Sequence, residues 1–513
     1  MHMLFSRARR GQASHAVVAA ALGLLAVAPM SASAHPGHAV RPVAPPHPAT
    51  GPADSADRRW LAGDHHVHSW FSASVKPSDT PGQPPVLVKA GDAVNPITVN
   101  ARQAAGHGLS WMVATDHGGP NHAKLNRNEA YPELVRSRTV TPGVLQFWGM
   151  ELDTPAAEHS SVIIPRSAME REALFGIETG YNRREPWPAD PARDTEPFML
   201  DALRHMQSLP QPPVLIVNHP SRTAETPGQY GLVSPAELRN WNDTAPQVAV
   251  GMEGAPGHQA STLNADGSAR PKGDRGGYSR APTLGGFDRM TAQLGGFWDS
   301  MLGEGRHWWI TSTSDSHRHY TEGGDDFWPG EYSKTYVKAA RTYDDVLDGL
   351  RQGRVFVTLG DLVSAVDVTA TTADGRKSAE IGGRLEVAAG SDVTIIIRVR
   401  DPAGRNFGGH KPDVARIDLI QGDVTGPASN RALDANASTR VVRRFTPTTW
   451  VREGEQLSMV YVLKNVRQSN YVRLRGTNGA ELEPQPDPLG EDPWADLWFY
   501  ANPIFIAVKL AEP

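Results

Sequence analysis

Apolar and polar positions alternate in blocks between about residues 58 and 360. Short apolar runs such as LSWMVATDH, VLQFWGMELD, PPVLIVNHP, QVAVGMEG and HWWITSTSDSH have the length and composition of buried strands. The stretches between them include segments such as PFMLDALRHMQ, which has the spacing of an amphipathic helix. Strands that alternate with helices predict an α/β fold for 58–360, with a parallel sheet and crossover helices.

The pattern changes after Leu362. The segments DVTIIIRVRD, ARIDLIQGD, QLSMVYVLKN and NYVRLRG alternate apolar and polar residues with a period of two, and turn residues separate them. This pattern predicts an antiparallel, sandwich-like β domain over 361–513. A chain of 513 residues also exceeds the size at which one hydrophobic core usually stops growing, so two domains are expected.

The first 34 residues have the pattern of an export signal. Three arginines (Arg7, Arg9 and Arg10) precede an apolar run over 16–28, and Ala32-Ser33-Ala34 matches a cleavage site. We therefore expect a periplasmic or secreted protein. The apolar run is shorter than the roughly 20 residues that span a membrane, so no span is expected after cleavage. Residues 35–57 are rich in proline and predict an extended linker.

Composition narrows the classes of partner and of chemistry. Charged residues make up 21% of the chain and the net charge is -5, which does not favour a surface that binds polyanions. We therefore expect no nucleic-acid partner. The chain has no cysteine, which excludes thiolate nucleophiles, disulfides and cysteine-ligated zinc. Any metal must be held by nitrogen and oxygen atoms.

Ligand-capable side chains gather at the ends of the predicted strands. In GDHHVH the side chains of His66 and His68 share one face of an extended strand, whereas His65 points to the other. Of 19 histidines, 13 lie between residues 59 and 360. The carboxyl ends of parallel strands in a barrel meet at one edge, so these residues are expected to form a metal site. The further candidates at such ends are His117, Glu151, His159, His219, Asp315 and His317.

This set of ligands favours particular metals and a particular chemistry. Many nitrogen and oxygen ligands without thiolate suit two or more divalent ions such as manganese, iron or zinc. A carboxylate such as Glu151 can bridge a pair of ions. Two ions lower the pKa of a bridging water and clamp the oxygens of a displacement reaction. The pattern therefore predicts metal-assisted hydrolysis by a bridging hydroxide.

Five motifs in order resemble those of the polymerase and histidinol phosphatase (PHP) family of metal-dependent phosphoesterases. They are D-x-H-x-H at 64–68, T-D-H at 115–117, G-M-E at 149–151, H-P at 219–220 and S-D-S-H at 314–317. The resemblance covers about residues 59–360 and implies a distorted (β/α)7 barrel. It implies that His66, His68, Glu151 and Asp315 hold one ion and that Glu151, His159 and His219 hold its neighbour. The C-terminal segments RLRGTNG and PWADLWFYANPIF are similar to exported members of the carbaryl-hydrolase type.

One departure from the family pattern concerns a third ion. Many members carry an acidic residue or a histidine shortly after the second histidine of the first motif. This chain has SWFSAS there, and Ala73 cannot ligate. His117 and His317 would be the other ligands of that ion. We therefore expect a binuclear centre and leave the third ion uncertain.

Several residues near the metals are candidates for other roles. Arg222 follows His219 by three residues and is expected to contact a substrate phosphate. Asp315 could position the attacking hydroxide or accept its proton. His319 could act as general acid towards the leaving group, or it could simply be exposed in its loop. Glu253 ends a strand and could orient a ligand histidine.

The leading hypothesis is an exported hydrolase of small-molecule phosphate esters. We expect phosphodiesters to be preferred over monoesters, because a site without its third ion lacks a partner for an extra phosphate oxygen. One alternative is a hydrolase of carboxylic or carbamate esters on the same metals, since the carbaryl-hydrolase type includes a carbamate hydrolase. A second alternative is a metal-stabilised protein that binds a glycan or another envelope component. Saturated coordination is usual in structural metal sites, and open positions would argue against this alternative.

Overall fold

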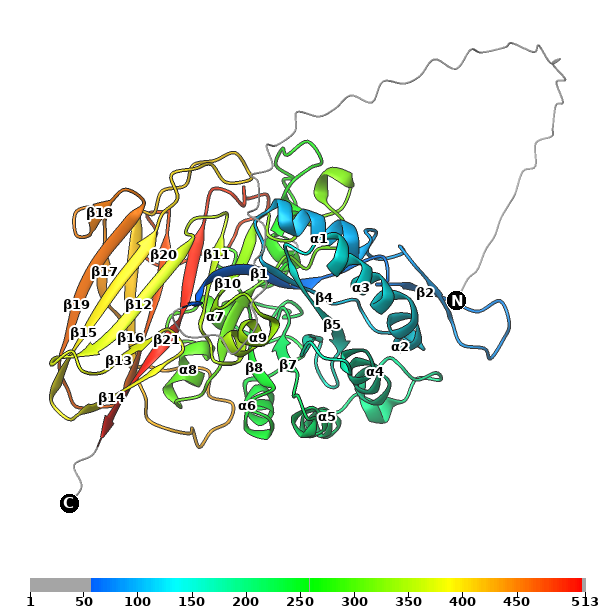
Figure 1. Cartoon of the computed structure of the whole chain (residues 1–513), viewed down its shortest axis with the longest axis horizontal. Coiled ribbons are helices and arrows are strands. Elements are labelled where there is room, and N and C mark those ends of the chain that lie inside the picture. Colours follow the sequence, from blue (N-terminus) through cyan, green and yellow to red (C-terminus); the bar gives the residue numbers. More distant parts are fainter. Residues whose placement is uncertain (1–56, 258, 510–513) are drawn as a thin grey trace, which may run out of the picture. The chain divides into compact units, whose positions relative to one another are not determined.

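The computed structural model describes residues 57–257 and 259–509. The expected export signal at 1–34 and nearly all of the expected linker at 35–57 lie outside the described residues. The described part is a mixed α/β fold, as predicted, with one large mixed sheet and two smaller antiparallel sheets (Figure 1).

The large sheet contains 14 strands and forms the centre of the fold. Its N-terminal strands run in the order β11-β10-β1-β4-β5-β6-β7-β8-β9. A separate hairpin, β2–β3, follows β1 in the chain. The bounds of these elements are β1 Arg59–Val67, β2 Ser74–Lys76, β3 Val86–Val88, β4 Trp111–Ala114, β5 Leu145–Asp153, β6 His159–Ile164, β7 Val214–Val217, β8 Ala249–Ala255, β9 Trp309–Ser312, β10 Ser333–Ala339 and β11 Val355–Leu359.

Strand directions agree with the prediction in part. The pairs β1–β4, β4–β5, β7–β8 and β8–β9 are parallel, but β6 runs antiparallel to both β5 and β7. Only residues 154–158 join β5 to β6. That connection is too short for a crossover, which needs a dozen or more residues, so the two strands form a hairpin.

The segment that directly follows β9 returns to β1. Val67 and Ser316 form a parallel bridge, and the backbone N–H of His68 donates to the carbonyl oxygen of Ser316 over 3.0 Å. His117 and Glu151 form a second such bridge beyond β4. The polar residues at the ends of β1, β4, β5 and β9 are thereby brought to one edge of the sheet.

Helices connect and cover these strands (Figure 1). The predicted helix in PFMLDALRHMQ is part of α5, which begins after Thr195, whose hydroxyl caps it, and buries its apolar side chains. Helix α6 begins with a capping box between Ser234 and Glu237. The helices are α1 Ile97–Gly106, α2 His122–Leu125, α3 Tyr131–Val140, α4 Glu170–Tyr181, α5 Glu196–Ser208, α6 Pro235–Thr244, α7 Arg289–Ala292, α8 Phe297–Gly303 and α9 Tyr343–Arg351.

The C-terminal part is built from strands in two sheets. The large sheet continues through β21-β20-β16-β17, with β14 pairing to β21, and a five-stranded antiparallel sheet has the order β13-β12-β15-β19-β18. Because β11 pairs with β21, one sheet runs unbroken across residue 361. The bounds are β12 Ala365–Thr372, β13 Ser378–Glu380, β14 Arg384–Ala388, β15 Ser391–Arg400, β16 Arg416–Asp423, β17 Arg440–Phe445, β18 Val451–Glu453, β19 Gln456–Val466, β20 Asn470–Thr477 and β21 Trp498–Lys509.

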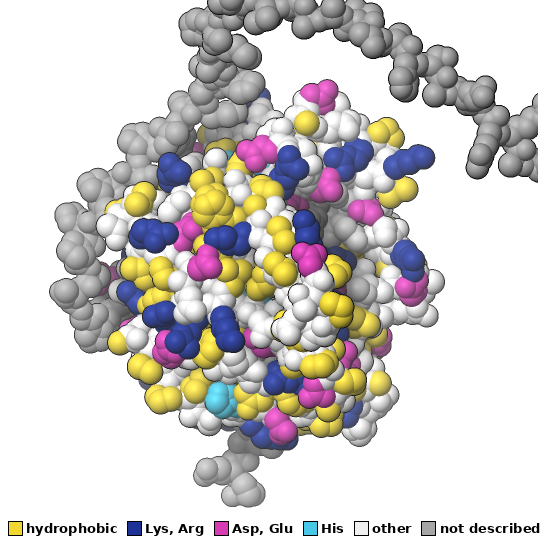
Figure 2. All heavy atoms as spheres, turned by 90° about the vertical axis from the view of Figure 1, so that its right-hand side faces the viewer, with side chains coloured by type: hydrophobic (Ala, Val, Ile, Leu, Met, Phe, Trp, Pro, Cys, Tyr) yellow, Lys and Arg dark blue, Asp and Glu magenta, His cyan; other side chains and the backbone are white. Residues whose placement is uncertain are grey.

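Two further observations concern the helices and one face of the surface. Within residues 57–257 and 259–509, every helix is too short or too polar to cross a lipid bilayer. Figure 2 shows one face, on which basic, acidic and apolar side chains are interspersed.

Candidate metal centre

The carboxylate of Glu151, at the end of β5, lies at the centre of a cluster of histidines. Its Oε1 is 3.0 Å from Nε2 of His66, 3.1 Å from Nδ1 of His159 and 3.2 Å from Nε2 of His219. Its Oε2 is 2.8 Å from Nδ1 of His117. Glu151 and His66 are almost completely buried, with 1% and 0% of their side chains exposed. The structure therefore brings together ligand types from five separate segments.

One group within this cluster has the spacing of ligands around an ion. Nε2 of His66 lies 3.0 Å from Nε2 of His68 and 3.0 Å from Oδ1 of Asp315. Nε2 of His68 lies 3.1 Å from the same oxygen. Atoms that each lie about 2.1 Å from one ion are roughly 3.0–3.4 Å from one another in octahedral or tetrahedral geometry. His66, His68, Glu151 and Asp315 therefore fit one divalent ion.

The other ring nitrogen of His66 is held by Glu253. Nδ1 of His66 is 2.7 Å from Oε1 of this buried carboxylate. A carboxylate accepts hydrogen bonds only, so Nδ1 carries a proton, and the lone pair of Nε2 would be available to an ion. Oε2 of Glu253 accepts the backbone N–H of His219 over 2.6 Å. Glu253 thus fixes two ligand segments, which agrees with one of the two roles considered for it, an orienting rather than a purely structural carboxylate.

Ser72 and Asp116 play the same part for His68. Nδ1 of His68 is 2.7 Å from Oγ of Ser72, and that hydroxyl donates to Oδ1 of Asp116 over 3.1 Å. Because the hydroxyl has one proton and gives it to Asp116, it accepts from Nδ1–H of His68. Asp116 also accepts the backbone N–H and the hydroxyl of Ser69. Asp116 therefore orients the first motif and is itself turned away from the ligand atoms.

A second group surrounds Glu151 on the side of β6 and β7. His159 contacts Glu151 through Nδ1, and its Nε2 lies 3.6 Å from Oδ1 of Asp153. His219 contacts Glu151 through Nε2, and its Nδ1 lies 3.4 Å from Oε2 of Glu158. His117, Glu151 and His159 could hold an ion that shares Glu151 with the first group, and Glu158, His159 and His219 form a further group. The set that the resemblance implied, Glu151, His159 and His219, is divided between these two groups.

A third group of ligand atoms includes a residue that the sequence analysis missed. Nε2 of His117 and Nε2 of His317 lie 3.4 Å apart, and Oδ2 of Asp92 lies 3.5 Å from each of them. His68 adjoins this pair, and His68, His117 and His317 together could hold an ion. Asp92 follows β3, in the segment that leads from the β2–β3 hairpin to α1. The carboxylate of Asp92 thus approaches the possible position of a third ion from a segment other than the one that contains Ala73.

Protonation equilibria show how strongly the cluster attracts positive charge. Burial alone lowers the pKa of His66, but Asp315, Glu151 and Glu253 raise it well above its ordinary value. Burial also lowers the pKa of His159, and the carboxylates of Glu151 and Asp153 raise it to about 10. Burial raises the pKa of Glu151, yet the surrounding histidines lower it well below its usual range. In the absence of a metal, protons take the place of the cation.

Two of the candidate ligands have a backbone conformation that is rare for residues with a side chain. His219 has φ 29° and Asp315 has φ 48°. Non-glycine residues in this region carry strain and are concentrated at functional sites. Gly257 allows the second of these turns, since a Cβ there would overlap the side chain of Asp315.

The cluster opens to solvent through a pocket of about 400 Å³. The ligands His117, Glu151, His159, Asp315 and His317 line it, so some coordination positions face the opening. The other lining residues are Asp92, Arg222, Arg318, Gly324, Asp325 and Asp326.

Arg222 lines this pocket, but its guanidinium group already forms ion pairs with two carboxylates. Its Nε and Nη2 donate to Oε1 of Glu158 over 3.2 Å and 2.7 Å, and its Nη1 donates to Oδ2 of Asp315 over 3.3 Å. Two of its five N–H groups remain for the expected contact with a substrate phosphate, while its charge is already shared with Glu158 and Asp315. Glu158, which precedes His159, is a second residue that the sequence analysis missed.

His319 is not brought to the pocket. Its Nε2 lies 2.8 Å from Oε2 of Glu331 and its Nδ1 lies 2.7 Å from Oγ1 of Thr321. Its ring stacks on Trp328, and only 5% of the residue is exposed. Both ring nitrogens of His319 therefore have partners away from the candidate ligands. In this position His319 does not face a leaving group in the pocket as a general acid would. The exposed position considered as the alternative is not observed either.

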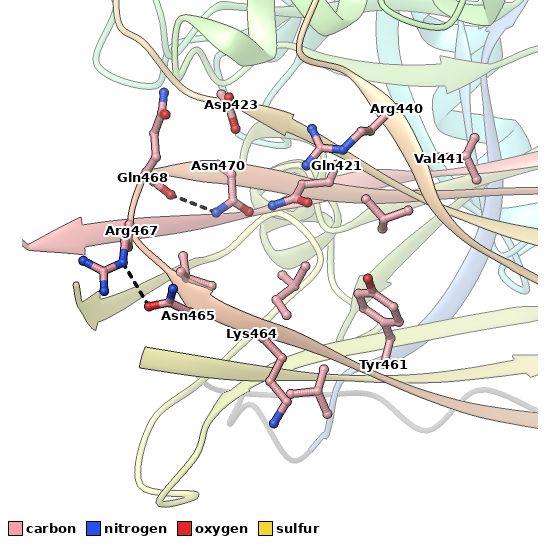
Figure 3. Close-up of a pocket in the computed structure, with 14 residues that line it drawn as sticks. Gln421, Asp423, Arg440, Val441, Tyr461, Lys464, Asn465, Arg467, Gln468 and Asn470 are labelled. Carbon is pink, nitrogen blue, oxygen red and sulfur yellow. Dashed lines mark hydrogen bonds between the residues drawn. The ribbon is translucent and has the colours of Figure 1, made fainter. Parts of the chain in front are cut away.

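A larger groove, of about 680 Å³, lies in the C-terminal β part (Figure 3). Strands β16, β17 and β19 line it, and Arg440, Tyr461, Lys464 and Arg467 are among its side chains. The groove contains no histidine and a single acidic residue, Asp423. It therefore lacks the ligands of a metal centre, and the chemistry of the described residues is concentrated in the smaller pocket.

The comparisons with known proteins add no family to this description. No family model matches the chain, and no curated protein has a matching sequence.

Proposed function

We propose that this protein is a metal-dependent hydrolase of phosphate esters, with a PHP-type barrel over about residues 59–360. The observation that carries the proposal is the convergence of His66, His68, Glu151 and Asp315 at ligand spacing, below a pocket that opens to solvent. Structural metal sites are usually saturated by protein ligands. A cluster with positions facing a pocket suits substrate binding better than a purely structural role.

The seven strands from β1 to β9 support the barrel. Leaving out the β2–β3 hairpin, they are neighbours in one sheet, and the bridge between Val67 and Ser316 brings the last of them back to the first. The candidate ligands lie in the last residues of these strands, at the start of β6 or shortly beyond the strand ends.

The donor set supports two divalent ions of the manganese, iron or zinc type, which share Glu151. Ions held there would supply an activated water and neutralise charge on the ester oxygens. Asp92 together with His117 and His317 offers a third position. In this proposal Asp315 also accepts a proton at Oδ2, and Arg222 restrains that oxygen.

One observation favours a second candidate, the hydrolysis of carboxylic or carbamate esters on the same metals. Arg222 is paired with Glu158 and Asp315. Arg318 is then the remaining cation in the lining of the pocket, and no carboxylate among the described residues pairs with it. A carboxylic or carbamate ester has no phosphate group, so its binding does not require an arginine that is free of carboxylate partners.

The experiment that tests the proposal compares three activated esters on the purified, metal-loaded protein. These are bis(p-nitrophenyl) phosphate, p-nitrophenyl phosphate and an aryl carbamate. Phosphate ester turnover that is lost in His66→Ala supports the proposal. Turnover of the carbamate alone would favour the second candidate, and a metal-loaded protein without any turnover would contradict both.

A further inference from the structure

Glu158 and Arg222 form an ion pair that connects three segments of the metal centre. Glu158 directly precedes His159, and Arg222 follows His219, whose carbonyl oxygen accepts the backbone N–H of Arg222 over 3.0 Å. The guanidinium group then reaches Oδ2 of Asp315. The pair is largely buried, with 20% of the Arg222 side chain and 19% of the Glu158 side chain exposed.

The geometry of this pair leaves little of Arg222 for a substrate. Nε and Nη2 both donate to Oε1 of Glu158, and Nη1 donates to Asp315. Oε2 of Glu158 is in turn 3.4 Å from His219. Nη1 and Nη2 each keep one N–H, but a phosphate that reached them would lie next to Glu158 and Asp315, which already compensate the charge of Arg222. A dianion placed there would be unfavourable, because its charge would lack a partner of its own in a poorly solvated place.

The rest of the lining of the 400 Å³ pocket is also rich in negative charge. Besides the ligands, the carboxylates of Asp92, Asp325 and Asp326 line it, and among the described residues Arg318 is the one cation there other than Arg222 and the histidines. Asp325 is paired with Arg270. Oδ2 of Asp326 accepts the backbone N–H groups of His317 and Arg318, so its charge is held at the rim. A phosphate monoester carries about -1.5 to -2 charge at pH 7, whereas a diester carries one negative charge. Ions held in the centre would attract either group, and the carboxylates around the pocket oppose that attraction with a repulsion that is larger for the more highly charged group.

We propose that Glu158 is a specificity-determining residue, which restricts the site to esters whose reacting group carries at most one negative charge. By holding Arg222, Glu158 makes this arginine a positioning residue for Asp315 and withholds it from a phosphate dianion. This inference rests on the proposed ester hydrolysis and assigns its substrate class: phosphodiesters are accepted and phosphomonoesters are rejected.

The decisive variant is Glu158→Gln, which keeps the size of the side chain and removes its charge. It should raise kcat/KM for p-nitrophenyl phosphate about tenfold and tighten the binding of inorganic phosphate by a similar factor, because Arg222 is released. It should not raise kcat/KM for bis(p-nitrophenyl) phosphate, so the ratio of monoester to diester rates should rise about tenfold or more. Glu172→Gln, the same change at an exposed position on α4, is the matched control and should alter neither ester.

Arg222→Ala separates positioning from binding. Loss of an interaction that holds Asp315 should lower kcat for the diester while KM stays nearly constant. A raised KM with unchanged kcat would mean that Arg222 binds the substrate, which overturns the inference. Metal content is measured for each variant, so that a lost ion is not mistaken for lost positioning.

The outcomes distinguish this inference from the proposed function. If the metal-loaded wild type hydrolyses a phosphate ester but Glu158→Gln leaves the ratio of diester to monoester rates unchanged, the inference fails and the proposed function stands. If the wild type hydrolyses neither ester, the proposed function fails, and calorimetric binding of phosphate to both proteins still tests Glu158. If Glu158→Gln does not fold, Glu158→Ala, which also removes the charge, should act in the same direction. A wild-type preference for the monoester would overturn the inference without any variant.

Discussion

Oδ2 of Asp92 lies 3.5 Å from Nε2 of His317, although the two residues belong to segments far apart in the sequence. The same oxygen lies equally far from Nε2 of His117. Asp92 has 41% of its side chain exposed, whereas the histidines are more buried. The carboxylate therefore approaches the pair of imidazoles from the solvent side and completes a third group of ligands.

We predict that Asp92→Asn weakens the binding of one ion and spares the other two. The amide has no charge to offset that of a divalent cation, so the affinity for the weakest ion should fall by about tenfold or more. Metal titration with mass spectrometric counting measures this. Asp79→Asn, an exposed change between β2 and β3, is the control. A protein that binds two ions both before and after the change at Asp92 would contradict the third position.

We predict that Glu253→Gln lowers metal affinity although Glu253 contacts no ion. The amide can present an N–H to Nδ1 of His66, which favours the wrong tautomer of that ring. Outer carboxylates of this kind are worth about 10–100-fold in metal affinity or activity. Isothermal titration of the metal-free variant tests the prediction, with Glu172→Gln as the surface control. An unchanged affinity would remove Glu253 from the support of the site.

The binding of metal should release protons and should strengthen as the pH rises. In the metal-free protein the pKa of His159 is about 10, so this ring is protonated at neutral pH and must lose its proton to bind an ion. Apparent affinity should therefore increase between about pH 6.5, the ordinary pKa of histidine, and pH 10. Calorimetry in buffers of different ionisation enthalpy counts the protons released. Binding without proton release at pH 7 would contradict this account.

The stability of the metal-free protein should show the opposite trend over the same range. The folded-state pKa of His159 is above that of an unfolded histidine, so its contribution is complete below about pH 6.5. That contribution is lost as the pH rises through about 10. The carboxylates of Glu151 and Asp153, whose pKa values are lowered, are ionised in both states throughout this range. Thermal unfolding of metal-free protein from pH 6.5 to 10 measures the effect.

The buried ion pair of Asp299 and Arg473 should be required for stability. Nε and Nη2 of Arg473, on β20, donate to the carboxylate of Asp299, on α8, over 2.8 Å and 2.7 Å. Arg473→Ala leaves Asp299 buried without this partner and should lower the free energy of unfolding by about 3–5 kcal/mol. Urea unfolding measures the change. Arg376→Ala, at an exposed pair, should leave the midpoint where it is, and equal midpoints for both variants would contradict the prediction.

The ligand cluster was predictable where sequence periodicity determines where a strand ends. His66, Glu151, His219 and Asp315 each follow or end an apolar run, and such ends meet at one edge of a sheet. The antiparallel course of β6 was not expected, although the short connection after Asp153 indicates a hairpin once the strand bounds are known.

Residues whose role depends on loop paths or side-chain partners were harder to predict. Asp92 lies outside the first motif, and no periodic pattern shows where the segment after β3 returns. Glu158 is adjacent to His159, but its pairing with Arg222 depends on the three-dimensional path of another segment. His319 follows His317 by two residues, yet Glu331 and Thr321 turn its ring away from the pocket. Apart from the local contact between His319 and Thr321, these contacts join segments that are apart in the sequence, and local sequence does not encode them.

The most direct test of the account is metal content and phosphodiester hydrolysis measured on the same samples of wild type and His66→Ala. The account predicts at least two ions per wild-type chain, hydrolysis of bis(p-nitrophenyl) phosphate, and loss of both an ion and the hydrolysis in the variant. A removed first-ion ligand should cost activity by roughly a factor of 100 or more. A wild type that binds no metal, or a variant that hydrolyses the diester at the wild-type rate, would contradict the account.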